Sequence, residues 1–141
     1  MNNKKEKILV SACLLGLNCK YDGKNNYSNE IDEFLKGYEV IPICPEIMGG
    51  LPTPRCPAEK IGDNVITKEG TDVTEQFVKG AKECLFLAKK YNVQKALLKL
   101  KSPSCGYGKI YDGTFSHTLI DENGVTAELL ESNGVEIIGI K

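Results

Sequence analysis

The chain has 141 residues, enough for one domain with a buried core, and its composition, 41% apolar and 26% charged, is typical of a soluble globular protein. Its 18 basic and 19 acidic residues give a net charge of -1, which argues against a broad surface for nucleic acid or for a membrane. The single histidine, His117, excludes a histidine-rich metal site and leaves one imidazole for any Ser-His-Asp or Cys-His catalytic arrangement.

In the first half of the chain, the spacing of apolar residues predicts strands and helices in alternation. Nearly continuous short apolar runs are typical of strands covered on both faces, and apolar residues three or four positions apart indicate helices. The expected elements are, in order, a polar tail at residues 1–6, a strand at 7–12, a helix capped by Ser28 or Asn29 that ends at Leu35, a strand at 38–43 and a long irregular loop at 44–57.

The second half begins with a hairpin signal, because Gly62-Asp63 is typical of a two-residue turn between two strands. The alternation of strands and helices then continues. The expected elements are hairpin strands at 58–61 and 64–67, the longest helix between a Thr71 or Thr74 cap and Asn92, a strand at 95–100, a loop with strand-like pieces at 106–121, a short helix from a Thr126 cap to Gly134, and a last strand at 135–140.

This order predicts an α/β fold: a single compact domain over residues 1–141, with a mainly parallel four-stranded sheet, flanking helices in a Rossmann-like, three-layer arrangement, and a small hairpin insertion. No internal repeat or interdomain linker interrupts it. In such sheets ligands bind beyond the carboxyl ends of the strands. We therefore look for functional residues just after the predicted strands.

Three cysteines occupy that position. Cys13, Cys44 and Cys105 each follow a predicted strand, in loops that contain glycine or proline. If the strands are parallel, these thiols converge at one edge of the sheet. Three thiolates can hold a zinc ion with one open position, or three irons of a [4Fe–4S] cluster with the fourth iron free. Unligated thiols remain the alternative.

The other three cysteines carry weaker signals. Cys84 lies on the apolar stripe of the long predicted helix, so we expect it in the core. Cys56 is expected to be a plain loop cysteine, and Cys19 is either a further ligand or a structural thiol. The basic residues before residue 8 resemble a signal peptide, but its apolar run is shorter than the roughly 7–15 residues required. We expect a cytoplasmic protein with reduced thiols.

Several polar residues accompany these cysteines. Glu46, two residues after Cys44, is the candidate proton carrier for general acid–base chemistry. Ser102 and Ser104 could hydrogen-bond a substrate or merely cap a turn, and Arg55 could bind an anionic or carbonyl group or be a surface charge. Asp22 could contact a substrate or simply build a turn. Because neither a Gly-x-Gly-x-x-Gly motif after the first strand nor a Walker loop occurs, the common nucleotide-binding motifs are absent.

Taken together, these segments resemble the thiouracil desulfurase (TudS) family. The segments are VSACLLG at 10–16, CKYDG at 19–23, CPE at 44–46, GGLPTPR at 49–55 and KSPSCG at 101–106. The resemblance implies a [4Fe–4S] cluster on Cys13, Cys44 and Cys105. It also implies hydrolytic removal of sulfur from thiouracil-type pyrimidines, giving uracil and sulfide, with the substrate sulfur bound at the open iron and with Glu46 and Ser102 as catalytic residues.

By this resemblance, Arg55, Asp22 and Ser104 are candidates for binding the substrate, a thiolated pyrimidine base or nucleotide, and a homodimer is possible. The main alternative is a non-catalytic iron–sulfur or metal-binding module that senses or stores. A thiol redox protein is disfavoured because the chain lacks a Cys-x-x-Cys motif.

Overall fold

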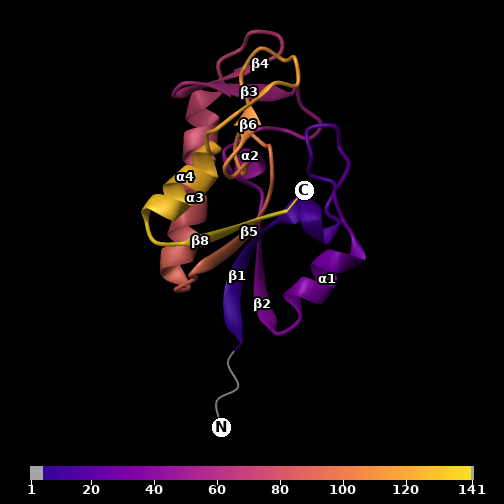
Figure 1. Cartoon of the computed structure of the whole chain (residues 1–141), viewed down its shortest axis with the longest axis vertical. Coiled ribbons are helices and arrows are strands. Elements are labelled where there is room, and N and C mark those ends of the chain that lie inside the picture. The colour runs from indigo at the N-terminus through magenta and orange to yellow at the C-terminus, as the bar shows by residue number, and fades with distance from the viewer. Residues whose placement is uncertain (1–4, 141) are drawn as a thin grey trace.

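Four parallel strands form the central sheet in the order β2-β1-β5-β8 (Figure 1). The computed structural model describes residues 5–140; residues 1–4 of the expected polar tail lie outside this range, and Glu6 already belongs to β1. The strands are β1 (Glu6–Ser11), β2 (Tyr38–Ile43), β5 (Lys95–Lys99) and β8 (Glu136–Ile140). All three neighbouring pairs are parallel, so the carboxyl ends of the strands share one edge.

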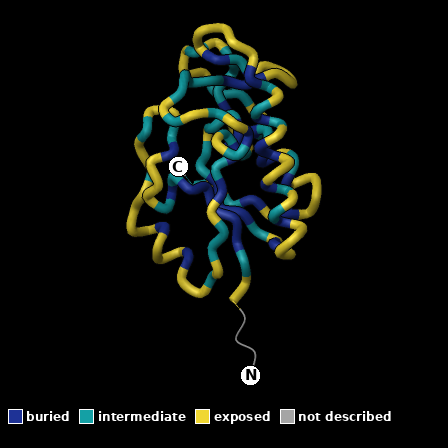
Figure 2. The backbone as a smooth tube through the Cα atoms, turned by 180° about the vertical axis from the view of Figure 1, so that it is seen from behind, coloured by how far each residue is buried: buried dark blue, intermediate teal, exposed yellow. Residues whose placement is uncertain are grey.

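Helices cover both faces of the sheet, which confirms the predicted three-layer α/β fold. On one face, α3 (Thr74–Lys90) and α4 (Val125–Ser132) pack against side chains such as Leu9 and Leu98. On the other, the 3-10 helix η1 (Ala12–Leu15) and α1 (Asn29–Leu35) pack against Ile8, Val10 and Leu97. The strands alternate between the two cores because successive side chains point to opposite faces. The buried tube segments of Figure 2 follow these strands through the centre of the molecule.

Two small antiparallel hairpins lie beyond the carboxyl edge of the sheet (Figure 1). The predicted hairpin is formed by β3 (Ala58–Ile61) and β4 (Asn64–Thr67), and a second one by β6 (Ile110–Tyr111) and β7 (Leu119–Ile120). Glu59 joins them, since its Oε1 accepts hydrogen bonds from the backbone N–H groups of Gly113 and Phe115 at 2.9 and 3.0 Å. Within residues 5–140, no helix is long and apolar enough to cross a membrane.

The structure corrects two expectations about the cysteine loops. Cys13 lies within η1 rather than in an irregular loop. The segment expected to be irregular begins with a short helix, α2 (Pro45–Met48), for which Cys44 is the extended N-cap residue. Proline suits the first turn of a helix because its missing N–H would be unpaired there. Both strand ends therefore turn directly into helical backbone.

Two expected helix caps are also wrong. Helix α3 starts from Val73 rather than from a threonine cap, and Asp72 Oδ1 accepts the Thr74 N–H at 2.8 Å. Helix α4 starts from Gly124 rather than from Thr126. Its first N–H groups are bound by backbone carbonyls of the 103–104 loop, a tertiary contact that replaces a side-chain cap.

Helix α2 packs tightly against α3 through two glycines. A Cβ atom on Gly80 would overlap the carbonyl oxygen of Pro45, and one on Gly49 would overlap the carbonyl oxygen of Gln76. The two backbones therefore approach more closely than any other residue would allow. This contact fixes the helix that carries Glu46.

We predict that Gly80→Ala destabilises the protein by about 1–3 kcal/mol, because the added methyl group would push α2 away from α3. In an unobstructed helix interior the same change would stabilise by about 1 kcal/mol, so the sign is diagnostic. Urea unfolding measures the change in the free energy of unfolding for Gly80→Ala and for Lys82→Ala, the control at an exposed site. A stability of Gly80→Ala equal to or above that of the wild type would contradict the close packing.

Candidate functional site

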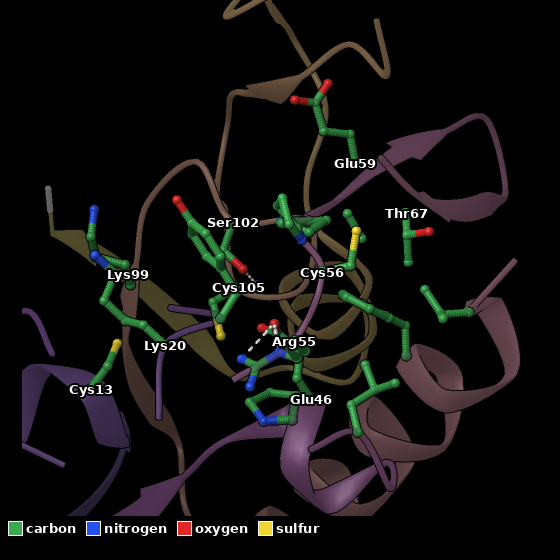
Figure 3. A pocket seen from close by; sticks show the side chains of 18 of the residues that line it. Cys13, Lys20, Glu46, Arg55, Cys56, Glu59, Thr67, Lys99, Ser102 and Cys105 are labelled. Carbon is green, nitrogen blue, oxygen red and sulfur yellow. Dashed lines mark hydrogen bonds and ion pairs between the residues drawn. The ribbon is translucent and has the colours of Figure 1, made fainter. Parts of the chain in front are cut away.

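A cavity of about 760 Å³ opens at the carboxyl edge of the sheet (Figure 3). Its walls come from the ends of β1, β2 and β5 and from the hairpin loops. Five of the six cysteines line it: Cys13, Cys19, Cys44, Cys56 and Cys105. The structure thus brings the three strand-end cysteines to one cavity, as the parallel-strand argument predicted, whereas Cys84 is fully buried in the core.

Cys13 and Cys44 are held in surroundings that favour their thiolate forms. The pKa of Cys13 is lowered to about 7, first by a hydrogen bond from the Cys19 thiol and then by Asn26, whose Nδ2 lies 3.3 Å from Sγ. The pKa of Cys44 is also lowered to about 7, first by the Cys19 thiol and then by the backbone N–H of Ile47 in α2. Thiolates are the form that binds metals, so both residues are suited to ligation at neutral pH.

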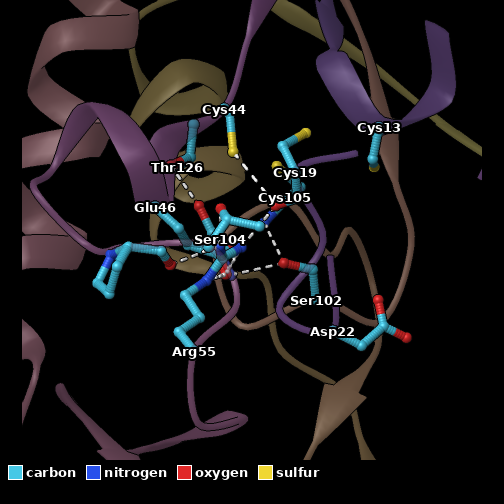
Figure 4. A network of polar contacts seen from close by, with 12 residues as sticks. Cys13, Cys19, Asp22, Cys44, Glu46, Arg55, Ser102, Ser104, Cys105 and Thr126 are labelled. Carbon is cyan, nitrogen blue, oxygen red and sulfur yellow. Dashed lines mark hydrogen bonds and ion pairs between the residues drawn. The ribbon is translucent and has the colours of Figure 1, made fainter. Parts of the chain in front are cut away.

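Cys19 lies between these two thiols (Figure 4). It is only 8% exposed, and its hydrogen bonds to Cys13 and Cys44 raise its pKa, so it keeps its proton while its neighbours lose theirs. Its carbonyl oxygen accepts a hydrogen bond from Arg55 Nη2 at 2.9 Å and lies 3.9 Å from Cys44 Sγ. The sequence left the role of Cys19 open, and the structure makes it a neighbour of two candidate ligands.

Cys105 is positioned by a loop that is bonded to itself and to α4. Ser102 Oγ accepts hydrogen bonds from the backbone N–H groups of Ser104 and Cys105, both at 3.1 Å. The N–H groups of Val125 and Thr126, in the first turn of α4, donate to carbonyls of residues 103 and 104 at 2.9 and 2.8 Å. Burial raises the pKa of the Cys105 thiol, which a hydrogen bond with Ser11 partly offsets. The Ser102 hydroxyl hydrogen makes no bond among the described residues, so it can donate into the cavity.

Two expected substrate-binding residues lie elsewhere. The Ser104 side chain is fully buried and hydrogen-bonded to Thr126 Oγ1 at 2.8 Å, which anchors the loop and keeps the hydroxyl out of the cavity. Asp22 builds a turn, because its Oδ1 accepts the Lys24 N–H at 3.0 Å, and it does not line the cavity. We therefore assign structural roles to both residues.

Glu46 and Arg55 form a buried ion pair on the cavity wall. Arg55 Nε and Nη2 both bind Glu46 Oε2, at 3.1 and 2.8 Å. The remaining Arg55 contacts are the Pro52 carbonyl, Thr53 Oγ1 and the Cys19 carbonyl, at 3.2, 3.0 and 2.9 Å. These five contacts match the five N–H donors of a guanidinium group. Arg55 therefore orients Glu46 and has no donor left for a substrate, which corrects its expected role.

The cavity wall contains further residues to which the sequence analysis assigned no place in the site. Tyr111 and His117 pack edge to face, with ring centroids 5.7 Å apart, and both line the cavity with Phe115. Lys20 and Lys99 line it near Cys13 (Figure 3). Lys20 lies in the CKYDG segment and Lys99 at the end of a predicted strand, but the sequence does not show where these side chains point, so it did not mark them as parts of one site.

We predict that iodoacetamide alkylates Cys13 and Cys44 in cluster-free protein with rates that rise between about pH 6 and pH 8. The reason is that their pKa values of about 7 make the thiolates available above neutral pH, whereas an ordinary thiol titrates near pH 8.5. Peptide mass spectrometry measures the rate of alkylation at each cysteine. Cys84, with a pKa raised to about 12 by burial, is the internal control and should not react. Equal reactivity of Cys13 and an unstructured cysteine peptide at neutral pH would contradict the lowered pKa of Cys13.

Three comparisons with known proteins show the family of this chain. The family model for 2-thiouracil desulfurase matches residues 8–140. The YbbK protein of Bacillus subtilis (strain 168), described as uncharacterised, is 43% identical over an alignment of 141 positions that covers 93% of each chain. A solved structure of the [4Fe–4S]-dependent thiouracil desulfidase TudS is 45% identical, with a TM-score of 0.89 over 96% of this chain and 91% of that one. The chain belongs to the 2-thiouracil desulfurase family.

Proposed function

We propose that this protein is a [4Fe–4S]-dependent desulfurase that hydrolytically removes sulfur from thiouracil-type pyrimidines, giving uracil and sulfide. The observation that carries the proposal is the convergence of Cys13, Cys44 and Cys105 on one cavity next to the Glu46 carboxylate. Membership of the 2-thiouracil desulfurase family supports the reaction, and the solved TudS relative supports the cofactor.

The donor set of the cavity fits an iron–sulfur cluster. We propose Cys13, Cys44 and Cys105 as the ligands, because each follows a different parallel strand and thiolates are the usual cluster ligands. When bound, the cluster supplies a Lewis-acidic iron for the sulfur of the substrate.

The residues of the chain supply the proton chemistry. Arg55 occupies Glu46 Oε2, so a proton taken from water goes to Oε1. The water oxygen attacks the thiocarbonyl carbon, the carbon–sulfur bond breaks, and the proton held by Glu46 passes to the departing sulfide. The second proton of the water leaves the new C–OH group as it becomes the carbonyl of uracil, and completes hydrogen sulfide. Thiouracil and water thus give uracil and hydrogen sulfide without a reductant. The free hydroxyl hydrogen of Ser102 can donate to the thiocarbonyl sulfur, on which negative charge develops during attack.

The same site implies a reducing setting. All six cysteines are free thiols in the structure, and five of them line the cavity. Thiols so close together remain available as ligands only where glutathione and thioredoxin keep them reduced. We therefore propose that the protein acts in the cytoplasm on a diffusible thiolated pyrimidine.

The ligand assignment is tested by serine substitutions in protein purified and reconstituted without oxygen. Cys13→Ser, Cys44→Ser and Cys105→Ser should each lower the iron and sulfide content well below about four of each per chain and abolish sulfide release from 2-thiouracil. Cys56→Ser, a change of the same kind on the same cavity, should retain both. Loss of the cluster in Cys19→Ser, with retention in one of the three proposed ligands, would overturn the assignment.

The role of Glu46 separates an enzyme from a non-catalytic cluster-binding module. Glu46→Gln keeps the acceptor for Arg55 but cannot hold a proton in exchange, so kcat should fall about 100-fold or more at unchanged iron content. Glu69→Gln, the same change at an exposed position on the cavity rim, should behave as the wild type. Full activity of Glu46→Gln would remove Glu46 from the mechanism, and absence of sulfide release from fully loaded wild type would favour the binding module.

A further inference from the structure

Asn26 is a half-buried residue in an otherwise exposed loop segment beside the cavity. Within residues 24–30, every other residue is exposed, whereas Asn26 turns inward and lines the cavity. Its backbone N–H donates to the Cys13 carbonyl at 2.8 Å, and its side-chain Nδ2 lies 3.3 Å from Cys13 Sγ. The backbone bond already holds the loop against η1, so the inward direction of the side chain requires another explanation.

The contact between Asn26 and Cys13 joins a hydrogen-bond donor to a sulfur that accepts. A thiolate sulfur has no hydrogen to give, so the amide nitrogen of the carboxamide, rather than its oxygen, faces Sγ. The N–H dipole places partial positive charge beside the sulfur and withdraws electron density from it. Hydrogen bonds to the ligand sulfurs are one of the means by which a protein sets the reduction potential and the retention of an iron–sulfur cluster.

The other two proposed ligands also have donors that the chain fixes in place. Ser11 Oγ accepts a backbone N–H from the end of β5 at 3.1 Å, which leaves its hydroxyl hydrogen for Cys105. The backbone N–H of Ile47, in α2, donates to Cys44. Asn26 completes this set for the third ligand. It is also the donor that can be replaced without altering the backbone of α2 or the buried end of β1.

We propose that Asn26 is a positioning residue whose hydrogen bond to Cys13 raises the reduction potential of the cluster and keeps the cluster bound. The inference rests on the proposed ligation by Cys13 and goes beyond it to a residue that acts through this ligand. Because an N–H donor stabilises added negative charge on the cluster, its loss favours the oxidised form. A cluster that is oxidised more easily is also destroyed more easily by oxygen.

The first test measures the reduction potential of the holoprotein after anaerobic reconstitution. Asn26→Asp keeps the size of the side chain but has no N–H donor, and Asn26→Leu removes all polar atoms, so both should shift the potential to a lower value. Asn25→Leu is the matched control, because Asn25 holds the same loop through Asn18 Oδ1 and the Tyr27 N–H, at 2.9 and 3.0 Å. It should keep the wild-type potential. An unchanged potential in both Asn26 variants would overturn the inference.

The second test follows the loss of the visible absorbance of the cluster when the holoprotein is exposed to air. The rate of loss should rise about 10-fold or more in Asn26→Asp and in Asn26→Leu, which is the size of effect that partners of metal ligands usually have. Asn25→Leu should lose its cluster at the wild-type rate. An equal rise in Asn25→Leu would assign the effect to a loosened loop and would overturn the inference.

Neither test requires turnover, so the inference and the proposed function can fail separately. If the loaded wild type releases no sulfide from 2-thiouracil but the Asn26 variants shift the potential, the desulfurase function fails and the inference stands. If sulfide is released and the potential does not move, the inference fails and the function stands. If Cys13→Ser retains a full cluster, Cys13 is not a ligand and the inference fails with that assignment.

Discussion

The parallel pairing of β1, β2 and β5 is the constraint on which the site depends. β1 and β2 end in register, with Ser11 opposite Ile43, so Cys44 follows its strand close to the point where Cys13 follows the other. Ser11 Oγ also accepts the Lys99 N–H at 3.1 Å, which ties the end of β1 to the end of β5. Three cysteines far apart in the sequence consequently meet at one edge of the sheet, as expected for ligand sites in parallel α/β folds.

Arg55 connects the loops that leave these strands. It bonds to Glu46 in α2, to the Cys19 carbonyl in the preceding loop, and to its own loop at Pro52 and Thr53. The Arg55 side chain is only 7% exposed and the Glu46 side chain 18%. Removing one partner of a buried ion pair typically destabilises by about 3–5 kcal/mol. One side chain thus sets the position of the proposed proton carrier and the path of the Cys19 loop together.

The sequence was sufficient for the sheet, for helices α1, α3 and α4 and for the three strand-end cysteines, because those follow from apolar periodicity and from the alternation of strands and helices. It was insufficient where function depends on which acceptor a donor finds in space. From the sequence, both Arg55 and Ser104 were candidates for binding a substrate. The structure shows that the Arg55 donors are used in five internal contacts and that the Ser104 hydroxyl is hydrogen-bonded to Thr126. Cys19 and the lysines are in loops or at strand ends, where no periodicity shows the direction of a side chain.

The most direct test of the central claim, that three strand-end thiols hold the cluster, is diffraction from anaerobically grown crystals at the iron absorption edge. The account predicts anomalous iron peaks within the cavity, bounded by the Sγ atoms of Cys13, Cys44 and Cys105, with Cys19 adjacent but unbound. Iron bound elsewhere in the chain, or held by Cys19 in place of one of the three, would contradict it.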